Sequence, residues 1–178
     1  MANTTYGHFN LGLTDVKITK IDGSAQEDLD AAQELTVSVT ISESVLEGDD
    51  VEKASVVKIR GGSGRAGAGS MSIGATAIVL GATPSTSGTT PNRVTTTKIT
   101  SALKPPYFKI YGMAYDDTLG ALQVIVHKAK ISGDIEFALQ SGDNNWVTPG
   151  WDFRCLANDS GDIIDLIQLE TAAALPAS

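Results

Sequence analysis

The most constraining feature of this sequence lies between Leu35 and Gly61, where two long β-strands are expected. In the first part of this segment, apolar and small hydroxyl residues alternate strictly. The apolar residues are Leu35, Val37, Val39 and Ile41, and the hydroxyl residues are Thr36, Ser38, Thr40 and Ser42. A period of two is typical of a half-buried strand. Strand-type composition resumes from Ser55 to Arg60 after an acidic break between Glu43 and Glu52, which predicts an antiparallel ribbon with a charged connection.

The hydroxyl face of this ribbon is unusual, because a free protein surface usually carries Lys and Glu. Small hydroxyl groups suit a wall that meets another subunit, or a channel to which nothing should adhere. We therefore take Thr36, Ser38, Thr40 and Ser42 as candidates for a lumen-facing surface.

The rest of the chain also favours strands. Alternation or turn signals predict them at Leu13 to Ile21, Tyr107 to Tyr115, Ala121 to Ile131, Ile135 to Gln140, and Trp151 to Cys155. One short helix is expected from about Met71 to Leu80, with Ser70 or Ser72 as its N-cap and Gly81 at its end. Ser24 to Gln33 is expected to be a connector or one helical turn. Asp162 to Thr171 fits a short helix or a last strand, and periodicity does not separate the two.

These elements predict a mainly β fold, an antiparallel β-sandwich or partly closed barrel with one short flanking helix and extended loops. At 178 residues the chain is expected to form a single domain. Residues 1–12 are expected to be a flexible N-terminal arm, residues 82–104 a long loop, and residues 172–178 a C-terminal tail.

Composition excludes several kinds of function. The net charge of −8 is unfavourable for general nucleic-acid binding, since contact with phosphates requires Lys and Arg. Cys155 is the single cysteine, so neither an internal disulfide nor a Cys-based zinc site is expected. No run approaches eighteen apolar residues, which argues against a membrane span, and no signal peptide is recognised at the start of the sequence.

One catalytic-looking motif is present, because residues 62–67 fit the G-x-G-x-x-G pattern of a dinucleotide-binding loop. Such a loop opens a helix and is followed about twenty residues later by an acid that holds the ribose. Neither feature is evident here. The alternative is that these glycines let the backbone bend or lie close to a neighbouring chain.

Other chemistry-bearing residues also have simpler explanations. His8 and His127 are isolated, so no metal site is expected from them. The acids from Glu43 to Glu52 lack the spacing of a calcium loop. Trp146 and Trp151 could form a sugar-stacking platform, but aromatic residues are only 6% of the chain and are needed in the core. We expect no enzyme activity and no cofactor.

The order of several segments resembles the major tail protein, or tail tube protein, of long-tailed bacteriophages, with the non-contractile type favoured. These segments are Val45 to Asp50 between the two long strands, Tyr107 to Gly112, the turn at Asp116 and Asp117, Val126 to Ile131, and Glu170 to Ala172. The resemblance extends over most of the chain, and its strongest elements are the L-x-G-D-D loop and the strand end at Lys128 to Lys130.

The resemblance implies a virion protein that self-assembles into stacked hexameric rings, assembled in the host cytoplasm and forming a hollow tail tube. Such a tube encloses a tape-measure protein, meets tail terminator and tail-tip proteins at its ends, and conducts genomic DNA without binding it specifically. It also implies that Leu46, Glu47, Gly48, Asp49 and Asp50 form a loop that reaches an adjacent ring or subunit. The strands that would line the lumen are Leu35–Ser42, Val51–Arg60, Tyr107–Ala114 and Ala121–Ile131. The alternatives are a carbohydrate- or receptor-binding β-sandwich of a virion, a nucleotide-dependent enzyme that uses Gly62 to Gly67, and the tube of a contractile tail or secretion apparatus.

Overall fold

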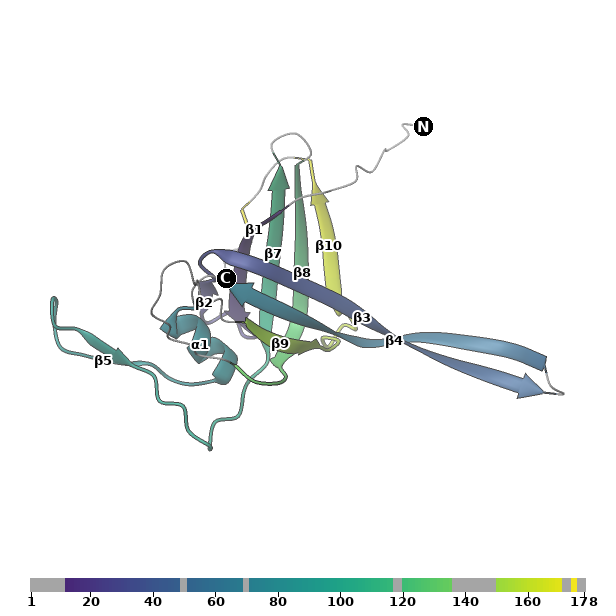
Figure 1. The fold of residues 1–178 in the computed structure, drawn as a ribbon, viewed down its shortest axis with the longest axis horizontal. Helices are drawn as coiled ribbons and strands as arrows, with labels where there is room; N and C mark the ends of the chain where they lie inside the picture. Colours follow the sequence, from purple (N-terminus) through teal and green to yellow (C-terminus); the bar gives the residue numbers. More distant parts are fainter. Residues whose placement is uncertain are drawn as a thin grey trace, which may run out of the picture.

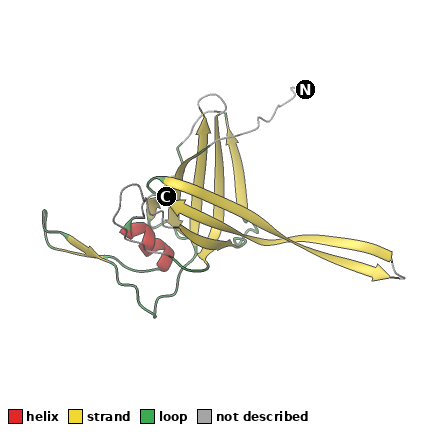
Figure 2. Cartoon of the chain, viewed as in Figure 1, coloured by secondary structure: helices red, strands yellow, loops and turns green. Residues whose placement is uncertain are grey.

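The chain is mainly β, as the sequence predicts, and all of its described strand pairs are antiparallel (Figures 1 and 2). The computed structural model describes residues 12–48, 51–68, 71–116, 120–135, 150–170 and 174–175. Several predicted features lie outside those residues: the strand expected from Ile135 to Gln140, apart from Ile135 itself, the turn after it, Trp146, His8, and most of the N-terminal arm and C-terminal tail. Leu175, in the predicted tail, is buried.

One large sheet contains most of the strands. Its order is β2-β1-β7-β8-β9-β4-β3, and β10 pairs with β8 off this path. The strands are β1 (Leu13–Lys20), β2 (Gln26–Asp28), β3 (Ala32–Gly48), β4 (Val51–Ala68), β7 (Phe108–Asp116), β8 (Gly120–Ile131), β9 (Gly150–Cys155) and β10 (Ile164–Leu169). The same edge of β8 pairs with β10 over Ala121 to Val126 and with β9 from Ala129 to Ile131, so the sheet divides there into two branches.

The branch made of β9, β4 and β3 folds back over the branch made of β1, β7 and β8. Although β3 is at the end of the strand order, it contacts β1 across the interior. Gly112 of β7 makes the close crossing possible, because a side chain there would collide with Leu35 of β3. The result is a two-layered, partly closed sandwich.

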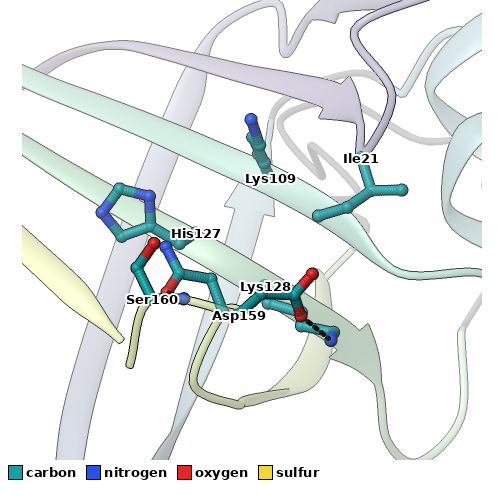
Figure 3. Close-up of a pocket in the computed structure, with 7 residues that line it drawn as sticks. Ile21, Lys109, His127, Lys128, Asp159 and Ser160 are labelled. Carbon is teal, nitrogen blue, oxygen red and sulfur yellow. Dashed lines mark hydrogen bonds and ion pairs between the residues drawn. The ribbon is translucent and has the colours of Figure 1, made fainter. Parts of the chain in front are cut away.

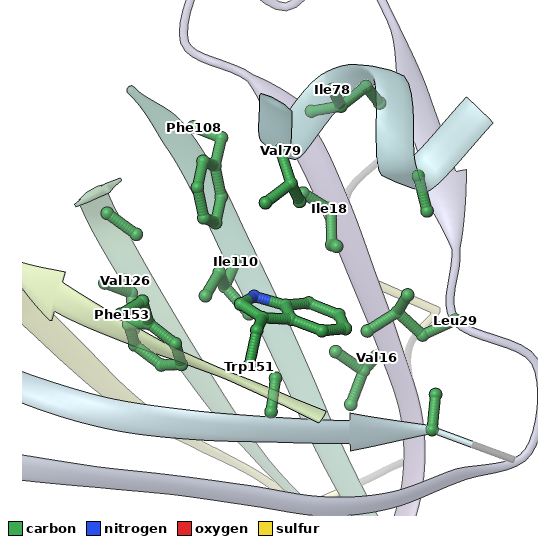
Figure 4. Packing of buried hydrophobic residues seen from close by; sticks show 14 of the residues in the cluster. Val16, Ile18, Leu29, Ile78, Val79, Phe108, Ile110, Val126, Trp151 and Phe153 are labelled. Carbon is green, nitrogen blue, oxygen red and sulfur yellow. The ribbon is translucent and has the colours of Figure 1, made fainter. Parts of the chain in front are cut away.

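The core lies between these layers (Figure 4). Alternate residues of β9, Trp151, Phe153 and Cys155, are almost fully buried, as the period of two predicts. They pack with side chains from the other layer and from the helix. These include Val16, Ile18, Leu29, Phe108, Ile110, Val126, Ile78 and Val79.

The helix α1 (Ile73–Leu80) covers one end of the core and contacts β1, β2 and β8. The predicted caps are confirmed at Ser72 and Gly81. The Ala75 N–H donates to Ser72 Oγ at 2.9 Å, and Gly81 adopts a left-handed conformation at φ 72°. The helix begins two residues after the predicted Met71, because Ser72 occupies the capping position.

Three sequence expectations need correction. The connector from Ser24 to Gln33 contains β2, because β1 offers an open edge with which it pairs. The acidic break is mostly strand, since β3 continues to Gly48 and stays paired with β4 there. The long loop at residues 82–104 includes a small hairpin made of β5 (Ser85–Ser87) and β6 (Val94–Thr96). The alternative left open at Asp162 to Thr171 is decided for a strand, because β10 pairs with the free edge of β8.

Candidate assembly interface

The two longest strands form a ribbon that leaves the body of the molecule (Figure 1). Pairing runs from Ala32 with Ala68 at the base to Gly48 with Val51 at the far end, and the register shifts after Ala32, Thr40 and Leu46. At the base, β4 also pairs with β9, from Gly62 to Gly67. Beyond Gly62, β4 has only β3 as a described strand partner. A two-stranded ribbon without a third strand or a covering layer is marginally stable in water.

The apolar face of β3 continues from the core onto the free part of this ribbon. Leu35 and Val37 pack against the core, so the predicted half-buried strand is confirmed there. Val39 and Ile41, which continue the same alternation, are 48% and 63% exposed. The expectation that they are buried is wrong for the single chain, because the other layer does not extend under this part of the strand.

Apolar residues of β4 extend this exposed surface. Ile59 lies opposite Ile41, and Val57 lies opposite Glu43, so both share the Ile41 side of the ribbon. Ile59 is 62% exposed and Val57 is 58% exposed. We call Val39, Ile41, Val45, Val57 and Ile59 the apolar stripe.

The opposite side of the ribbon carries a smaller apolar patch. Val56 lies opposite Ser44, and Leu46 lies opposite Ala54 near the end of the ribbon. Both large side chains are exposed, Leu46 by 65%. Apolar side chains on both faces of a projecting ribbon are unfavourable in water and indicate that another surface covers them.

The adjacent pair Val56 and Val57 is the sequence feature that predicts apolar side chains on both faces of the ribbon. A half-buried strand alternates apolar and polar residues, whereas two β-branched residues in succession place one on each face. The sequence analysis assigned these residues to a strand but did not recognise them as an exposed contact surface.

The four hydroxyl residues proposed to face a lumen lie on the side of β3 turned away from Leu35 and Val37. Thr36, Ser38 and Thr40 are exposed, while Ser42 is half-buried. Arg65 lies opposite Thr36 and links three strands through ion pairs, with Asp152 at 3.2 Å and Glu34 at 3.7 Å. Near the base of the ribbon this outer face is therefore polar and its charges are paired, whereas Val56 and Leu46 lie on the same face farther out.

The proposed inter-subunit loop lies at the far end of the ribbon. Leu46 is exposed there, and the backbone of Glu47 and Gly48 belongs to β3. Asp49 and Asp50 lie outside the described residues. Nearer the body, the Ser55 hydroxyl donates to Glu43 across the ribbon. The ribbon thus combines apolar side chains with an acidic tip.

The glycine-rich motif does not form a nucleotide-binding loop. Residues 62–67 lie inside β4 and pair with strands on both sides, and no helix begins there. A side chain at Gly64 would collide with the Phe153 ring and with the Thr36 carbonyl oxygen. Gly62 and Gly64 instead allow close approach between segments of the same chain, and an approach to a neighbouring chain stays a prediction.

The remaining candidates do not form a reactive centre. Trp151 is fully buried in the core and presents no surface for a sugar. His127 Nε2 lies 2.9 Å from Asp165 Oδ2, close in distance but without the geometry of a hydrogen bond. Within the described part of the chain, no group of three or more His, Cys, Asp or Glu residues could hold a metal ion.

His127 also borders a small polar cavity of about 280 Å³ (Figure 3). Lys109, Lys128 and the turn from Asn158 to Ser160 line the rest of it, together with Ile21. Lys128 lies 3.8 Å from Asp159. No hydrogen bond joins Ser160 to His127 among the described contacts.

The sheet also has free margins. β2 and β3 stand at the two ends of the described strand order, and each pairs with one neighbour. Unpaired N–H and C=O groups at such margins can pair with another chain. β3 therefore combines a free backbone edge with exposed apolar side chains.

No family model matches the sequence, and no curated protein matches it. Among the described helices, none has the length and apolar character needed to cross a membrane.

Proposed function

We propose that this protein is a structural subunit that self-assembles into stacked hexameric rings and forms the hollow tail tube of a bacteriophage. The observation that carries the proposal is the projecting ribbon, whose apolar stripe stays exposed in the single chain. Such a ribbon gains stability when a neighbouring subunit covers it. The six-fold ring and the tube follow from the resemblance of the sequence to tail tube proteins.

In this proposal the ribbon of each subunit lies on the next subunit or ring. Burial of apolar side chains supplies the affinity, and pairing along the free edge of β3 supplies register. The proposed contact surface includes the loop from Leu46 to Asp50. One surface of the subunit contacts a different surface of its neighbour, and such contacts close into rings or continue as filaments.

The lumen of the proposed tube would be lined partly by the hydroxyl residues from Thr36 to Ser42. Three of them are exposed and lie on the outer face of β3. The hydroxyl groups themselves offer phosphates no fixed positive charge, although Arg65 and Lys58 lie opposite Thr36 and Ser42 on the same face, and the net charge of −8 favours repulsion of DNA. The lumen would therefore enclose the tape-measure protein and later pass DNA without retaining it.

Negative-stain electron microscopy of the purified protein tests this proposal. We expect hollow rods or six-fold rings above a threshold protein concentration, with sedimentation of the assembled material. A protein that remains monomeric at high concentration, or forms only compact dimers, would count against the proposal. The carbohydrate-binding alternative would instead give saturable glycan binding and a small discrete oligomer.

A further inference from the structure

A second projection leaves the molecule on the side opposite the ribbon (Figure 1). It begins after α1 and contains the hairpin of β5 and β6, and we call residues 83–104 the outlying segment. Every residue from Thr83 to Thr96 is exposed. β5 and β6 pair with each other and belong to no larger sheet among the described strands.

The outlying segment holds its shape with few described contacts. Thr86 and Thr95 share a hydrogen bond between their hydroxyl groups at 3.1 Å, and the Ser85 hydroxyl donates to the Thr96 carbonyl at 3.4 Å. Val94 and Ile99 remain 58% and 57% exposed. Ordering a backbone costs about 1–2 kcal/mol per residue, and burial of apolar side chains normally offsets that cost. Within one chain this segment buries little, so a partner surface would supply the missing burial.

The charge of the segment identifies the chemistry of that partner. Arg93, Lys98 and Lys104 lie in it, it contains no acidic residue, and none of the three makes an ion pair in the described structure. The sequence on either side of the segment likewise contains basic residues and no acidic ones. Residues 53–115 carry eight of the thirteen Lys and Arg residues and none of the twenty-one acids. The remaining parts of the chain carry five basic and twenty-one acidic residues, a net charge of −16.

Acidic surface is therefore abundant on the rest of this chain. The stretch from Leu156 to Ser178 contains four acidic residues and no Lys or Arg. Part of it forms β10, which lies on the ribbon's side of β8 (Figure 1). The Asp159 side chain in this stretch is fully exposed. A subunit thus presents positive charge on one side and exposed carboxylates elsewhere, of which Asp159 lies 3.8 Å from Lys128 of its own chain.

We propose that the outlying segment docks on the acidic surface of a second copy of this chain. The three cations meet carboxylates of the neighbour, and Val94 and Ile99 become buried at the same contact. This inference rests on the proposed function, since it names a second contact in the assembly. Because the segment and the ribbon project in opposite directions, each subunit contacts one neighbour through its ribbon and another through its outlying segment.

Reversing the three charges tests the inference. In the variant Arg93→Glu, Lys98→Glu, Lys104→Glu, like charges face the acidic neighbour, so we expect the critical concentration for assembly to rise at least tenfold. The matched control Arg93→Lys, Lys98→Arg, Lys104→Arg keeps every charge and should assemble like the wild type. Thermal unfolding followed by circular dichroism should be nearly unchanged in both variants, because the three side chains are exposed. Assembly of the reversed variant at the wild-type concentration would overturn the inference.

A cross-linking experiment keeps the test independent of tube formation. Thr89→Cys adds an exposed thiol at the hairpin, whereas Cys155 is buried and should not react. A photoreactive group attached at residue 89 should cross-link to a second copy, preferentially to acidic segments, and less efficiently at high salt. Cross-links confined to one chain would overturn the inference.

The two proposals can fail separately. Intermolecular cross-links from residue 89 without rings or tubes would contradict the proposed function and leave the docking contact standing. Tubes formed equally well by the charge-reversed variant would support the proposed function and contradict this inference. If the reversed variant assembles normally but loses retention of added duplex DNA, the occupant is nucleic acid, and docking on a second copy is wrong.

Discussion

The apolar stripe on the ribbon allows a quantitative test of assembly. The variant Ile41→Ser, Val57→Ser, Ile59→Ser replaces three large apolar side chains that share one side of the ribbon. They are 63%, 58% and 62% exposed in the single chain, so more than half of each side chain is available for burial by a neighbour. Fully burying a Val or Ile side chain contributes about 1.5–3 kcal/mol, so the part still available contributes about 1–2 kcal/mol per residue.

The triple variant should therefore lose about 3–5 kcal/mol per ribbon contact. Since about 1.4 kcal/mol corresponds to a factor of ten, the critical concentration for assembly should rise by roughly 10²- to 10⁴-fold. Sedimentation of assembled protein across a concentration series measures that threshold, and negative-stain microscopy checks the form of the polymer. The single chain should remain folded, because substitutions at exposed positions usually change stability by about 0.5 kcal/mol or less.

A conservative variant separates apolar burial from disturbance of the strands. Ile41→Val, Val57→Ile, Ile59→Val keeps three β-branched apolar residues and should assemble within about tenfold of the wild type. Two results would refute the reasoning. One is a serine variant that forms tubes at the wild-type threshold. The other is a serine variant that fails to assemble because its body has unfolded, seen as loss of cooperative melting.

Three further predictions follow from the sequence and the fold. Asp49→Lys with Asp50→Lys should impair polymerisation while the monomer stays folded, and normal tube lengths would contradict this. Gly64→Val should lower stability by about 1–3 kcal/mol in urea unfolding, because the added side chain meets the Phe153 ring, whereas Gly12→Val, at an open position, should have little effect. Burial raises the pKa of the Cys155 thiol to about 11, above its ordinary value of 9.0. Because the thiol ionises more readily in the unfolded chain, its contribution to the free energy of unfolding is fully present below pH 9 and falls by about 2–3 kcal/mol as the pH rises toward 11. Cys155→Ala should remove this pH dependence.

Much of the fold was predictable because it depends on local patterns. Alternation placed β1, β7, β8 and β9 within a few residues of their bounds, and the capping residues Ser72 and Gly81 placed the end of the helix. Patterns of this kind report which faces of an element are apolar, and each element then buries that face. β2 was missed, because a three-residue strand shows no periodicity and depends on the edge of β1 that it joins.

The sequence predicted where the candidate interface lies along the chain, but not that its apolar side chains are exposed. The sequence located the two long strands and the acidic tip, yet it treated Val39 and Ile41 as buried. Alternation identifies the apolar side of a strand but not how far the opposing layer extends. That extent depends on β7 and β8, which lie far away in the sequence. The positive outlying segment was read as a loop, since its hydroxyl-rich composition gave no sign that it projects from the body.

The order of residues alone thus determined a β-rich chain with one capped helix, a long paired ribbon and an excess of negative charge, because these properties follow from neighbours a few positions apart. The tertiary structure decided where the layers end. It showed that the apolar stripe continues past the core, that the glycine-rich strand is crowded by Phe153, and that two projections point in opposite directions. These features depend on contacts between segments distant in sequence, and no local pattern encodes them.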